Sequence, residues 1–562
     1  MAYVITQRCC KDASCISECP VDCIRPTPDQ AEYATAEILH IDPATCIDCG
    51  SCVPPCPVDA IFSEDDLIAP LRRYADINAD YYDKHPLQPD ITSPLPAVRR
   101  VPATGRKLRV AIVGAGPAAS YAVEALLRRA DAEIDVIEKL PTPGGLVRAG
   151  VAPDHPDTKR IIEVFDSTHT AAGVQRYFNV TVGEHISQAE LLDHHHAVIY
   201  AVGTATDHRT GVPGEELPGS RSATEFVAWY NGHPDCADNE YDLTGDRAVI
   251  IGNGNVALDV ARILTADPAD LAITDISPPA LEALRNSMIR EVVLLGRRTP
   301  VHAAYTSTEF LALAYLPNVD VVIDESALVL DPISRSLLDD PTAAFKYALT
   351  AEYAATPTGS GSRRIEFRYL LSPVAYYGHG QVERVKFVHN EIRLVDGAHV
   401  AEPTGRTGSI ETSLVLRSVG YRAQPIRDLP FDTRRAVVPN EQGRVIDSNR
   451  QPLRGLYVTG WVKRGAQGVI GTNRFDAEET VEHLVTDFLA GALAPPAGNR
   501  TAFAELLATR RPQYIDETGW HAIDSAERAA GQANGCPRVK FTDTGTILDI
   551  AAHKEVDYPA TT

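Results

Sequence analysis

The stretch KLRVAIVGAGPAA, residues 107–119, decides the fold of most of this chain. Its apolar first half is typical of a buried parallel strand, and Gly114, Gly116 and Ala119 form the G-x-G-x-x-A pattern that opens a helix. A second predicted strand, residues 133–138, ends in the acid Glu138. Together these features predict a Rossmann-like dinucleotide site. An acid at that strand end accepts hydrogen bonds from ribose hydroxyls and repels a 2′-phosphate, which fits FAD or NAD.

A second copy of the pattern lies at residues 247–259, RAVIIGNGNVALD. Its partner strand, residues 291–296, ends in an arginine pair instead of an acid, and this favours the 2′-phosphate of NADP. The alternative is a pair of solvated surface charges. Between them, residues 265–290 form a long insertion with a predicted helix near 279–287. The residues expected to bind NADP here are Gly252, Asn253, Gly254, Asn255, Val256, Arg297 and Arg298.

Nine of the eleven cysteines lie within the first 56 residues. The run CIDCGSCVPPCP, residues 46–57, has the C-x2-C-x2-C-x3-C-P spacing that holds a cubane iron–sulfur cluster. Zinc sites more often bring two C-x2-C pairs together across a longer gap. The spacing therefore favours a cluster over zinc.

An internal repeat appears when residues 9–24 are laid over residues 46–61 with an offset of 37. In such modules the cysteine before proline reaches across to the other cluster. The second cluster, a [4Fe–4S] centre, is then expected on Cys19, Cys46, Cys49 and Cys52. The first is expected on Cys9, Cys15 and Cys56, with Asp12 at the fourth corner.

Asp12 leaves the type of the first cluster open, because it falls where the second run has Cys49. Three thiolates suit a [3Fe–4S] cluster, whereas a carboxylate is a harder, weaker ligand that would complete a [4Fe–4S] cluster. Alternatively, Asp12 faces solvent beside a three-iron cluster. A third possibility is that Cys10 replaces Cys9. By the repeat, Cys10 and Cys23 occupy no ligand position.

Charge and composition exclude several functions. The net charge of −22 disfavours nucleic acids and anionic membranes as partners, and residues 1–66 alone carry −9. This acidic module suits a basic protein partner, or is simply a solvated face. We expect a cytoplasmic protein, monomeric rather than oligomeric. Residues 67–106 are predicted to be a proline-rich linker, either a semi-rigid tether or a strap ordered on its neighbour.

Residues 107–562 resemble the adrenodoxin-reductase-like ferredoxin–NADP reductases. The motifs that carry the resemblance are GAGPAA (114–119), GVAPDHP (150–156), GNGNVALD (252–259), GRR (296–298) and GWVKRGAQGVIG (460–471). Residues 1–66 resemble bacterial seven-iron and eight-iron ferredoxins, and the whole chain resembles a mycobacterial-type fusion of the two. The implied α/β fold is a small α+β two-cluster domain followed by two Rossmann-like domains: FAD over 107–206 and 425–562, which also includes the C-terminal tail, and NADP over 207–424.

The same resemblance implies further site residues. The contacts expected with FAD are Leu146, Val182, Trp461, Gly468, Val469 and Ile470, of which Gly468 would also touch NADP. Glu309 would lie on the nicotinamide side, and His155 near the flavin. Hydride transfer needs positioning more than acid–base groups, so either residue is equally well explained as a structural ion pair.

The predicted activity is that of a ferredoxin–NADP reductase with its own ferredoxin. A hydride from NADPH reduces FAD, and single electrons then pass through the clusters to an external acceptor, for which the resemblance suggests a cytochrome P450. Two alternatives are an electron-input subunit resembling the small subunit of glutamate synthase, and an iron or redox sensor that uses the first cluster.

Overall fold

The computed structural model describes residues 2–87, 107–204, 206–359 and 361–552. The first domain contains two antiparallel strand pairs, β1 (Tyr3–Ile5) with β4 (Ile61–Ser63) and β2 (Ile24–Arg25) with β3 (His40–Ile41). The 37-residue offset relates the start of β1 to that of β3, and the start of β2 to that of β4. Each pair thus joins one strand from each half of the internal repeat.

The predicted linker is wrong in its first half, where the structure has a helix, α2 (Arg73–Lys84). Tyr74, Asn78 and Tyr82 are buried, and their spacing of four residues places them on one face. The Asn78 side chain accepts the N–H groups of Ile5 and Ile41 at 3.2 and 2.8 Å. The helix therefore belongs to the first domain. The rest of the predicted linker, residues 88–106, lies outside the described residues.

The FAD-type domain is built on a seven-stranded sheet that confirms its predicted discontinuity. The strand order is β20-β21-β22-β8-β5-β6-β7, and β22 pairs in parallel with β8 although the whole second domain separates them. All of β5 is buried, as the sequence predicts. The strands are β5 (Leu108–Val113), β6 (Ala132–Ile137), β7 (Val174–Tyr177), β8 (Ala197–Tyr200), β20 (Asn440–Glu441), β21 (Arg444–Ile446) and β22 (Pro452–Val458).

The NADP-type domain has a six-stranded parallel sheet in the order β10-β18-β11-β12-β14-β13. Its strands are β10 (Ser220–Ser222), β11 (Arg247–Ile251), β12 (Glu291–Leu295), β13 (Val319–Ile323), β14 (Arg363–Arg368) and β18 (Leu414–Arg417). A two-stranded ribbon, β9 (Thr206–Asp207) with β19 (Tyr421–Arg422), lies where the chain crosses between the two sheets. A separate antiparallel sheet, absent from the sequence prediction, is formed by β15 (Leu371–Tyr377), β16 (Arg384–Val395) and β17 (Ala398–Glu411).

Helices cover both sheets. In the FAD-type domain α3 (Pro117–Arg129) packs against α16 (Thr472–Leu489). The NADP-type domain carries α8 (Ala223–Tyr230), α9 (Asn255–Thr265), α12 (Ser307–Ala312) and α14 (Pro341–Ala355). The helix predicted in its insertion is present as α11 (Pro278–Arg285), preceded by α10 (Pro268–Ala272). The short helices α4 (Leu146–Ala149), α5 (Pro156–Lys159) and α15 (Trp461–Arg464) lie in loops near the predicted sites.

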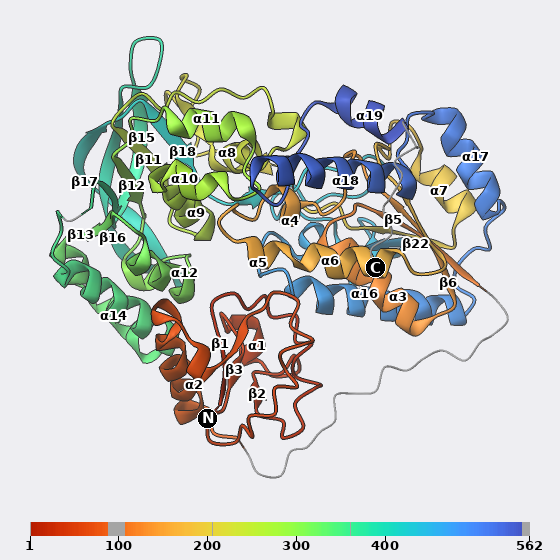
Figure 1. Cartoon of the computed structure of the whole chain (residues 1–562), viewed down its shortest axis with the longest axis horizontal. Helices are drawn as coiled ribbons and strands as arrows, with labels where there is room; N and C mark the ends of the chain where they lie inside the picture. The colour runs from red at the N-terminus through yellow and green to blue at the C-terminus, as the bar shows by residue number, and fades with distance from the viewer. Residues whose placement is uncertain (1, 88–106, 205, 360, 553–562) are drawn as a thin grey trace.

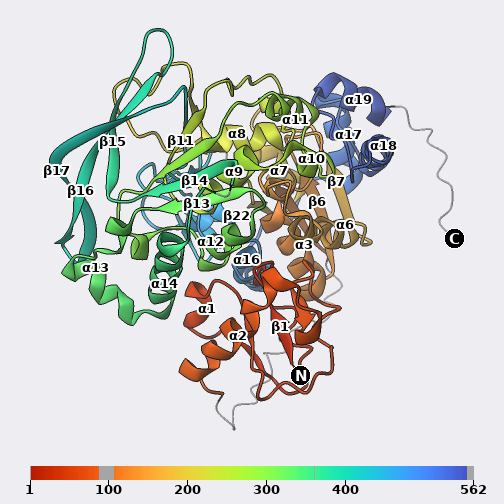
Figure 2. The same ribbon diagram turned by 60° about the vertical axis from the view of Figure 1, so that its left-hand side comes forward.

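Figures 1 and 2 show the first domain lying against both nucleotide-binding domains, with α2 beside α14. The C-terminal region, in which the sequence shows no motif, forms α17 (Arg500–Arg510), α18 (Glu517–Asn534) and α19 (Thr544–Ala552) at the opposite side of the molecule. Arg148 pairs with the fully buried Glu527 of α18 at 2.5 Å, so these helices are part of the FAD-type domain.

Candidate functional site

The first glycine loop joins β5 to α3 and leaves room for a ligand. Gly114 has φ +110°, and a Cβ there would lie 2.6 Å from the carbonyl oxygen of Ala201, so only glycine fits. At Gly116 the nearest atom to an added Cβ is the Cα of Gly145 at 3.7 Å. Space therefore remains beside the N-terminus of α3, where backbone N–H groups attract a pyrophosphate. Ala119 is buried in the first turn of that helix.

Glu138 follows β6 and holds this loop. Its two carboxylate oxygens accept the N–H groups of Ala115 and Leu140, each at 2.9 Å. Burial raises the pKa of Glu138, and these hydrogen bonds act against that rise. A carboxylate oxygen accepts more than one hydrogen bond, so Glu138 retains acceptor capacity for ribose hydroxyls.

The second glycine loop joins β11 to α9 in the same way. Gly252 has φ +117°, and a Cβ there would collide with the carbonyl of Ser418. Gly254 precedes α9, and the atom nearest to an added Cβ is 3.9 Å away in Ala304. The Asn255 side chain accepts the N–H of Thr306 at 2.8 Å, which ties this loop to the start of α12.

The arginine pair ends β12 beside this loop. Arg297 is exposed and Arg298 is half-buried. Burial lowers the pKa of Arg298, and the neighbouring guanidinium of Arg297 lowers it further. An anion bound between the two would relieve this repulsion. Asn253 accepts the N–H of Tyr305 through its carbonyl at 3.0 Å, and Val256 packs against the domain core.

Residues 460–471, which we call the flavin segment, connect β22 to α16 and contain the short helix α15. Trp461 donates its indole N–H to the carbonyl of Gln467 at 3.0 Å. Gly468 has φ +81°, and the hydroxyl of Thr472 accepts the N–H of Val469 at 3.1 Å. These bonds fix the main chain where the sequence predicts a flat ring to lie close to backbone amides. The other expected FAD contacts lie in separate loops, Leu146 in α4 and Val182 in a bridge with Ile186.

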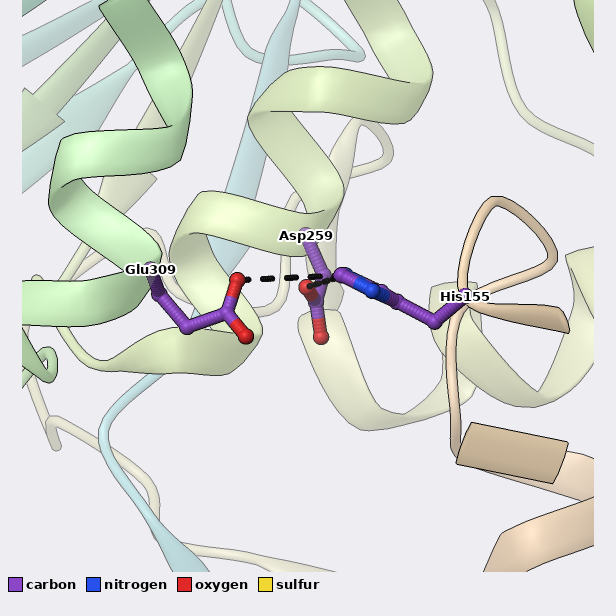
Figure 3. Close-up of side chains that lie close together, drawn as sticks. All are labelled: His155, Asp259 and Glu309. Atoms are coloured by element: carbon purple, nitrogen blue, oxygen red, sulfur yellow. Dashed lines mark ion pairs between the residues drawn. The ribbon is translucent and has the colours of Figure 1, made fainter. Parts of the chain in front are cut away.

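His155 and Glu309 come from different domains and meet in one charged network (Figure 3). His155, just before α5, has its Nε2 3.8 Å from Glu309 of α12 and 3.7 Å from Asp259 of α9. At the centre of the network, Arg262 donates to Glu309 at 3.3 Å and to both carboxylate oxygens of Asp154 at 2.9 and 3.1 Å. The network therefore joins the two nucleotide-binding domains.

The charges of this network shift the pKa values of His155 and Asp154. Burial and Arg262 lower the pKa of His155, but the carboxylates of Glu309, Asp259 and Asp154 outweigh them and the pKa is raised. Burial raises the pKa of Asp154, yet Arg262 brings it down to about 2. His155, Asp259 and Glu309 have ligand atoms within 4.8 Å of one another, a spacing that suits a metal ion. Because the Arg262 guanidinium already lies among these groups, a metal cation would be repelled there.

Sequence reasoning missed Asp154, Asp259 and Arg262 as members of this network. Asp154 and Asp259 stand in the quoted motifs, and Asp259 and Arg262 are three residues apart on α9, the spacing of a helical ion pair. That spacing was a usable signal. Their meeting with Glu309 depends on tertiary structure alone.

The cysteines predicted to hold the first cluster surround one cavity. Its lining includes Cys9, Cys15, Cys56 and Asp12, together with Cys10 and the apolar side chains Ile5, Leu39, Val58 and Ile61. We call it the inner cavity, because Cys9 and Cys56 pack against the same apolar cluster as Ile470 of the flavin segment. The donor set and the apolar walls fit an iron–sulfur cluster.

The cysteines predicted to hold the second cluster surround another cavity, which we call the outer cavity. Cys19, Cys46, Cys49 and Cys52 line it, as do Tyr3, Cys23 and Ile47. The Sγ atoms of Cys23 and Cys19 are 3.4 Å apart. None of the eleven cysteines, all of them among the described residues, forms a disulfide. Thiolates grouped around a cavity without cross-linking fit a second cluster.

The two cavities differ in exposure. At the outer cavity Ile47 is 59% exposed, and Cys49 is exposed. Asp48, beside them, and Asp66, at the end of the short 3-10 helix after β4, are also exposed. The outer cavity therefore opens at an acidic surface.

The inner cavity lies against the flavin segment. The N–H of Gly471 donates to the carbonyl of Cys10 at 2.9 Å, and a Cβ at Gly471 would collide with the backbone of Lys11 and Asp12. Such an approach is possible only for glycine. The first domain therefore contacts the reductase directly beside the residues expected to hold the flavin.

The opposite side of the first domain contacts the NADP-type domain. Glu37 accepts the N–H of Ser307 at 2.7 Å, at the start of the helix that carries Glu309. Arg73 of α2 donates to both carboxylate oxygens of Glu352 in α14 at 2.8 and 2.9 Å. The first domain thus bridges the two nucleotide-binding domains.

Two nucleotide-binding sheets joined by a short ribbon, with a two-cavity cysteine domain against both, define a pyridine-nucleotide-dependent flavoprotein oxidoreductase with an iron–sulfur domain. Residues 108–299 match the family model of pyridine nucleotide-disulphide oxidoreductases, and residues 39–62 match the 4Fe-4S binding domain. Over 564 residues the chain is 46% identical to a probable ferredoxin/ferredoxin–NADP reductase of Mycobacterium tuberculosis, covering 98% of this chain and 95% of that protein. The chain belongs to this ferredoxin/ferredoxin–NADP reductase family.

One further relative matches the reductase part alone, both in sequence and as a solved structure. NADPH-ferredoxin reductase FprA of Mycobacterium tuberculosis is 43% identical and covers 79% of this chain and 99% of its own length. A solved structure of FprA in complex with NADPH superposes with a TM-score of 0.75 at 42% identity, over 80% of this chain and all of that one. These matches confirm the predicted family, the fold class and the oxidoreductase activity, an NADPH-driven electron transfer with a fused ferredoxin.

The cofactor classes follow from the same findings: FAD and NADP in the reductase, and 4Fe-4S binding in the first domain. Over the described ranges, every helix is too short or too polar to cross a membrane.

Proposed function

We propose that this enzyme accepts a hydride from NADPH and delivers single electrons, through two iron–sulfur clusters, to an external protein. The observation that carries the proposal is the order of the two cysteine-lined cavities. The inner one lies against Gly471 at the end of the flavin segment, and the outer one opens at the surface through Cys49. This order supports a path from the nucleotide sites to a docked partner.

The cofactors supply the redox chemistry: when bound, the flavin converts a two-electron hydride into single electrons, which the clusters carry one at a time. The chain supplies binding and orientation. The loops at Gly116 and Gly254 present helix N-termini to the two pyrophosphates. Glu138 selects an adenosine without a 2′-phosphate, whereas Arg297 and Arg298 select one that carries it. Each nucleotide site thereby accepts its own cofactor.

The network around Arg262 is proposed to position the nicotinamide. Hydride transfer depends on the distance and angle between two rings, and His155 and Glu309 belong to different domains whose relative placement sets that geometry. Their role is therefore orientation.

Thiolates are proposed as the cluster ligands. In the inner cavity these are Cys9, Cys15 and Cys56, and in the outer cavity Cys19, Cys46, Cys49 and Cys52. The outer cavity is then the [4Fe–4S] site.

The external acceptor is proposed to be a basic protein that docks beside Ile47, where Asp48 and Asp66 are exposed. Charge complementarity of this kind steers association and raises its rate. A cytochrome P450 with a basic proximal surface has the required chemistry. We further propose that the enzyme works as a monomer, because the first domain already supplies the electron-carrying partner of the reductase.

Anaerobic addition of NADPH to the holoenzyme tests this function. The flavin absorbance and the electron paramagnetic resonance (EPR) signals of the clusters should both change, and each enzyme should take up more electrons than the flavin alone holds. Reduction of the flavin with no change at the clusters would contradict the proposed path.

The same assay tests the nucleotide preference. Replacing both arginines, Arg297→Ala with Arg298→Ala, should lower kcat/KM for NADPH by about a hundredfold or more, because each of the two lost charge-assisted hydrogen bonds costs about 1.5–3 kcal/mol. The value for NADH should change little. Equal losses for both nucleotides would contradict recognition of the 2′-phosphate.

A further inference from the structure

Asp12 is the one corner of the inner cavity that departs from the internal repeat, and it is already engaged. Its carboxylate is only 12% exposed. One oxygen accepts the N–H of Ser14 at 3.2 Å, and the other accepts the Ser14 hydroxyl at 2.5 Å. That second oxygen also lies 3.3 Å from Nη1 of Arg474. Asp12 therefore neither faces solvent nor stands free for a metal.

Arg474 belongs to the reductase, in the first turn of α16. Its Nη1 also donates to the main-chain carbonyl of Asp12 at 3.0 Å and to the Ser14 hydroxyl at 2.6 Å. On its other side, Nη2 donates to Glu124 of α3 at 3.1 Å. The guanidinium is thus anchored in the FAD-type domain and reaches across the interface to the edge of the inner cavity.

We propose that Arg474 holds Asp12 away from iron, so that the docked inner cavity offers three cysteine ligands and carries a three-iron cluster. The inference rests on the proposed function, which places a cluster in this cavity. A carboxylate that binds iron gives up its charge to the metal, and Arg474, which would keep Glu124, would lose its ion pair with Asp12 across a nearly buried interface, which is costly. The reductase domain therefore sets the iron content of its own ferredoxin.

Cys10 does not replace the missing ligand. It lines the inner cavity, but it is 5% exposed and belongs to the apolar cluster that the first domain shares with the FAD-type domain. Its carbonyl is bound by Gly471. Both features hold Cys10 in the interface.

Release of Asp12 should open a fourth iron position. One ferrous ion then adds to the one-electron-reduced cluster, [3Fe–4S]0 + Fe2+ → [4Fe–4S]2+, with iron, sulfide and charge balanced. The Asp12 carboxylate becomes the fourth ligand. NADPH, through the enzyme's own activity, supplies the electron that reduces the three-iron cluster beforehand.

The test is an anaerobic titration of the NADPH-reduced holoenzyme with ferrous ion, followed by oxidation and measurement of the three-iron EPR signal. The concentration of ferrous ion that abolishes the signal should be lower by about tenfold or more for Arg474→Met than for wild type. The double variant Arg474→Met with Asp12→Asn should retain the signal. Arg474→Lys keeps the charge, so the ferrous concentration at which it loses the signal should lie between those of wild type and Arg474→Met. An intermediate value also argues against a general folding defect as the cause.

Arg73→Met is the matched control, because it removes another arginine–carboxylate pair between the first domain and the reductase, on the side of the NADP-type domain, without touching Asp12. It should behave like wild type. Equal iron uptake by wild type and Arg474→Met, or by the single and double Arg474 variants, would overturn the inference. If wild type shows the outer [4Fe–4S] signal but no three-iron signal, the inference is overturned and the proposed electron path still stands. If wild type shows neither signal, the proposed function itself is overturned.

Discussion

The inner and outer cavities are built from the two halves of one internal repeat, yet they have different surroundings. Cys15 and Cys52 correspond under the 37-residue offset, and both are buried, at 6% and 7% exposure. Lys11 and Asp48 also correspond, and both have positive φ. The backbone is thus repeated, while the side chains beside it are not. Because the cysteines correspond and the neighbouring side chains differ, we infer that the neighbours of a cavity, more than its cysteines, determine whether it contacts the reductase or an external partner.

At position 11 the inner cavity has a lysine, whose Nζ donates to the carbonyls of Tyr33 and Ala36 at 2.7 and 2.5 Å. At the matching position the outer cavity has an exposed acid, Asp48. The inner residue stabilises its own domain, whereas the outer one is available to a partner. This contrast supports a contact with the reductase at the inner cavity and a contact with an external partner at the outer cavity.

The largest expected effect is at the inner cavity, with Gly471→Val. The new side chain would wedge the backbone of residues 11 and 12 away from α16, and overpacking of this kind costs about 1–3 kcal/mol. The equilibrium constant for docking of the first domain should fall about tenfold, and the rate at which NADPH reduces the clusters, relative to the flavin, should fall with it. Stopped-flow absorbance measures both rates.

Ala490→Val is a matched control, because it adds the same bulk at an exposed position just after α16. Its rate ratio should equal that of wild type. Unchanged cluster reduction in Gly471→Val would mean that the contact at Cys10 is not on the electron path.

A smaller effect is expected at the outer cavity, with Asp48→Asn and Asp66→Asn combined. For cytochrome c, used as a basic probe acceptor, KM should rise by a few-fold, about 1 kcal/mol or less, and should depend less on salt. Steady-state assays at two ionic strengths measure this.

The matched control for the acidic surface, Asp396→Asn with Glu402→Gln, removes the same charge from the hairpin of β16 and β17, in the separate antiparallel sheet. This control should leave the KM for cytochrome c and its dependence on salt unchanged. An equal rise in KM in the two double variants would show that net charge matters and the outer surface does not.

Features encoded by short-range spacing could be predicted from the sequence. The two glycine loops, the strand-end residues Glu138 and Arg297, and the grouping of the cysteines around two cavities all follow from local patterns or from the internal repeat. Helix α2 was also within reach, since Tyr74, Asn78 and Tyr82 are spaced by four residues, but a polar composition beside many prolines favoured a linker.

Contacts between distant segments could not be predicted in this way. Arg474 meets Asp12 across more than four hundred residues, and nothing in the sequence near either one indicates the pair. The same holds for Gly471, whose need for glycine comes from the backbone of another domain. The open question of Asp12 was therefore posed by the sequence and answered by tertiary structure.

The central claim is that electrons from NADPH reach the outer cluster only through the inner one, and the matched pair Cys15→Ala and Cys52→Ala tests it most directly. After anaerobic NADPH addition, EPR should show the inner cluster of Cys52→Ala reduced as in wild type. In Cys15→Ala the outer cluster should stay oxidised with NADPH and become reduced with dithionite, which proves that it is present. Reduction of the outer cluster of Cys15→Ala by NADPH at the wild-type rate would contradict the account.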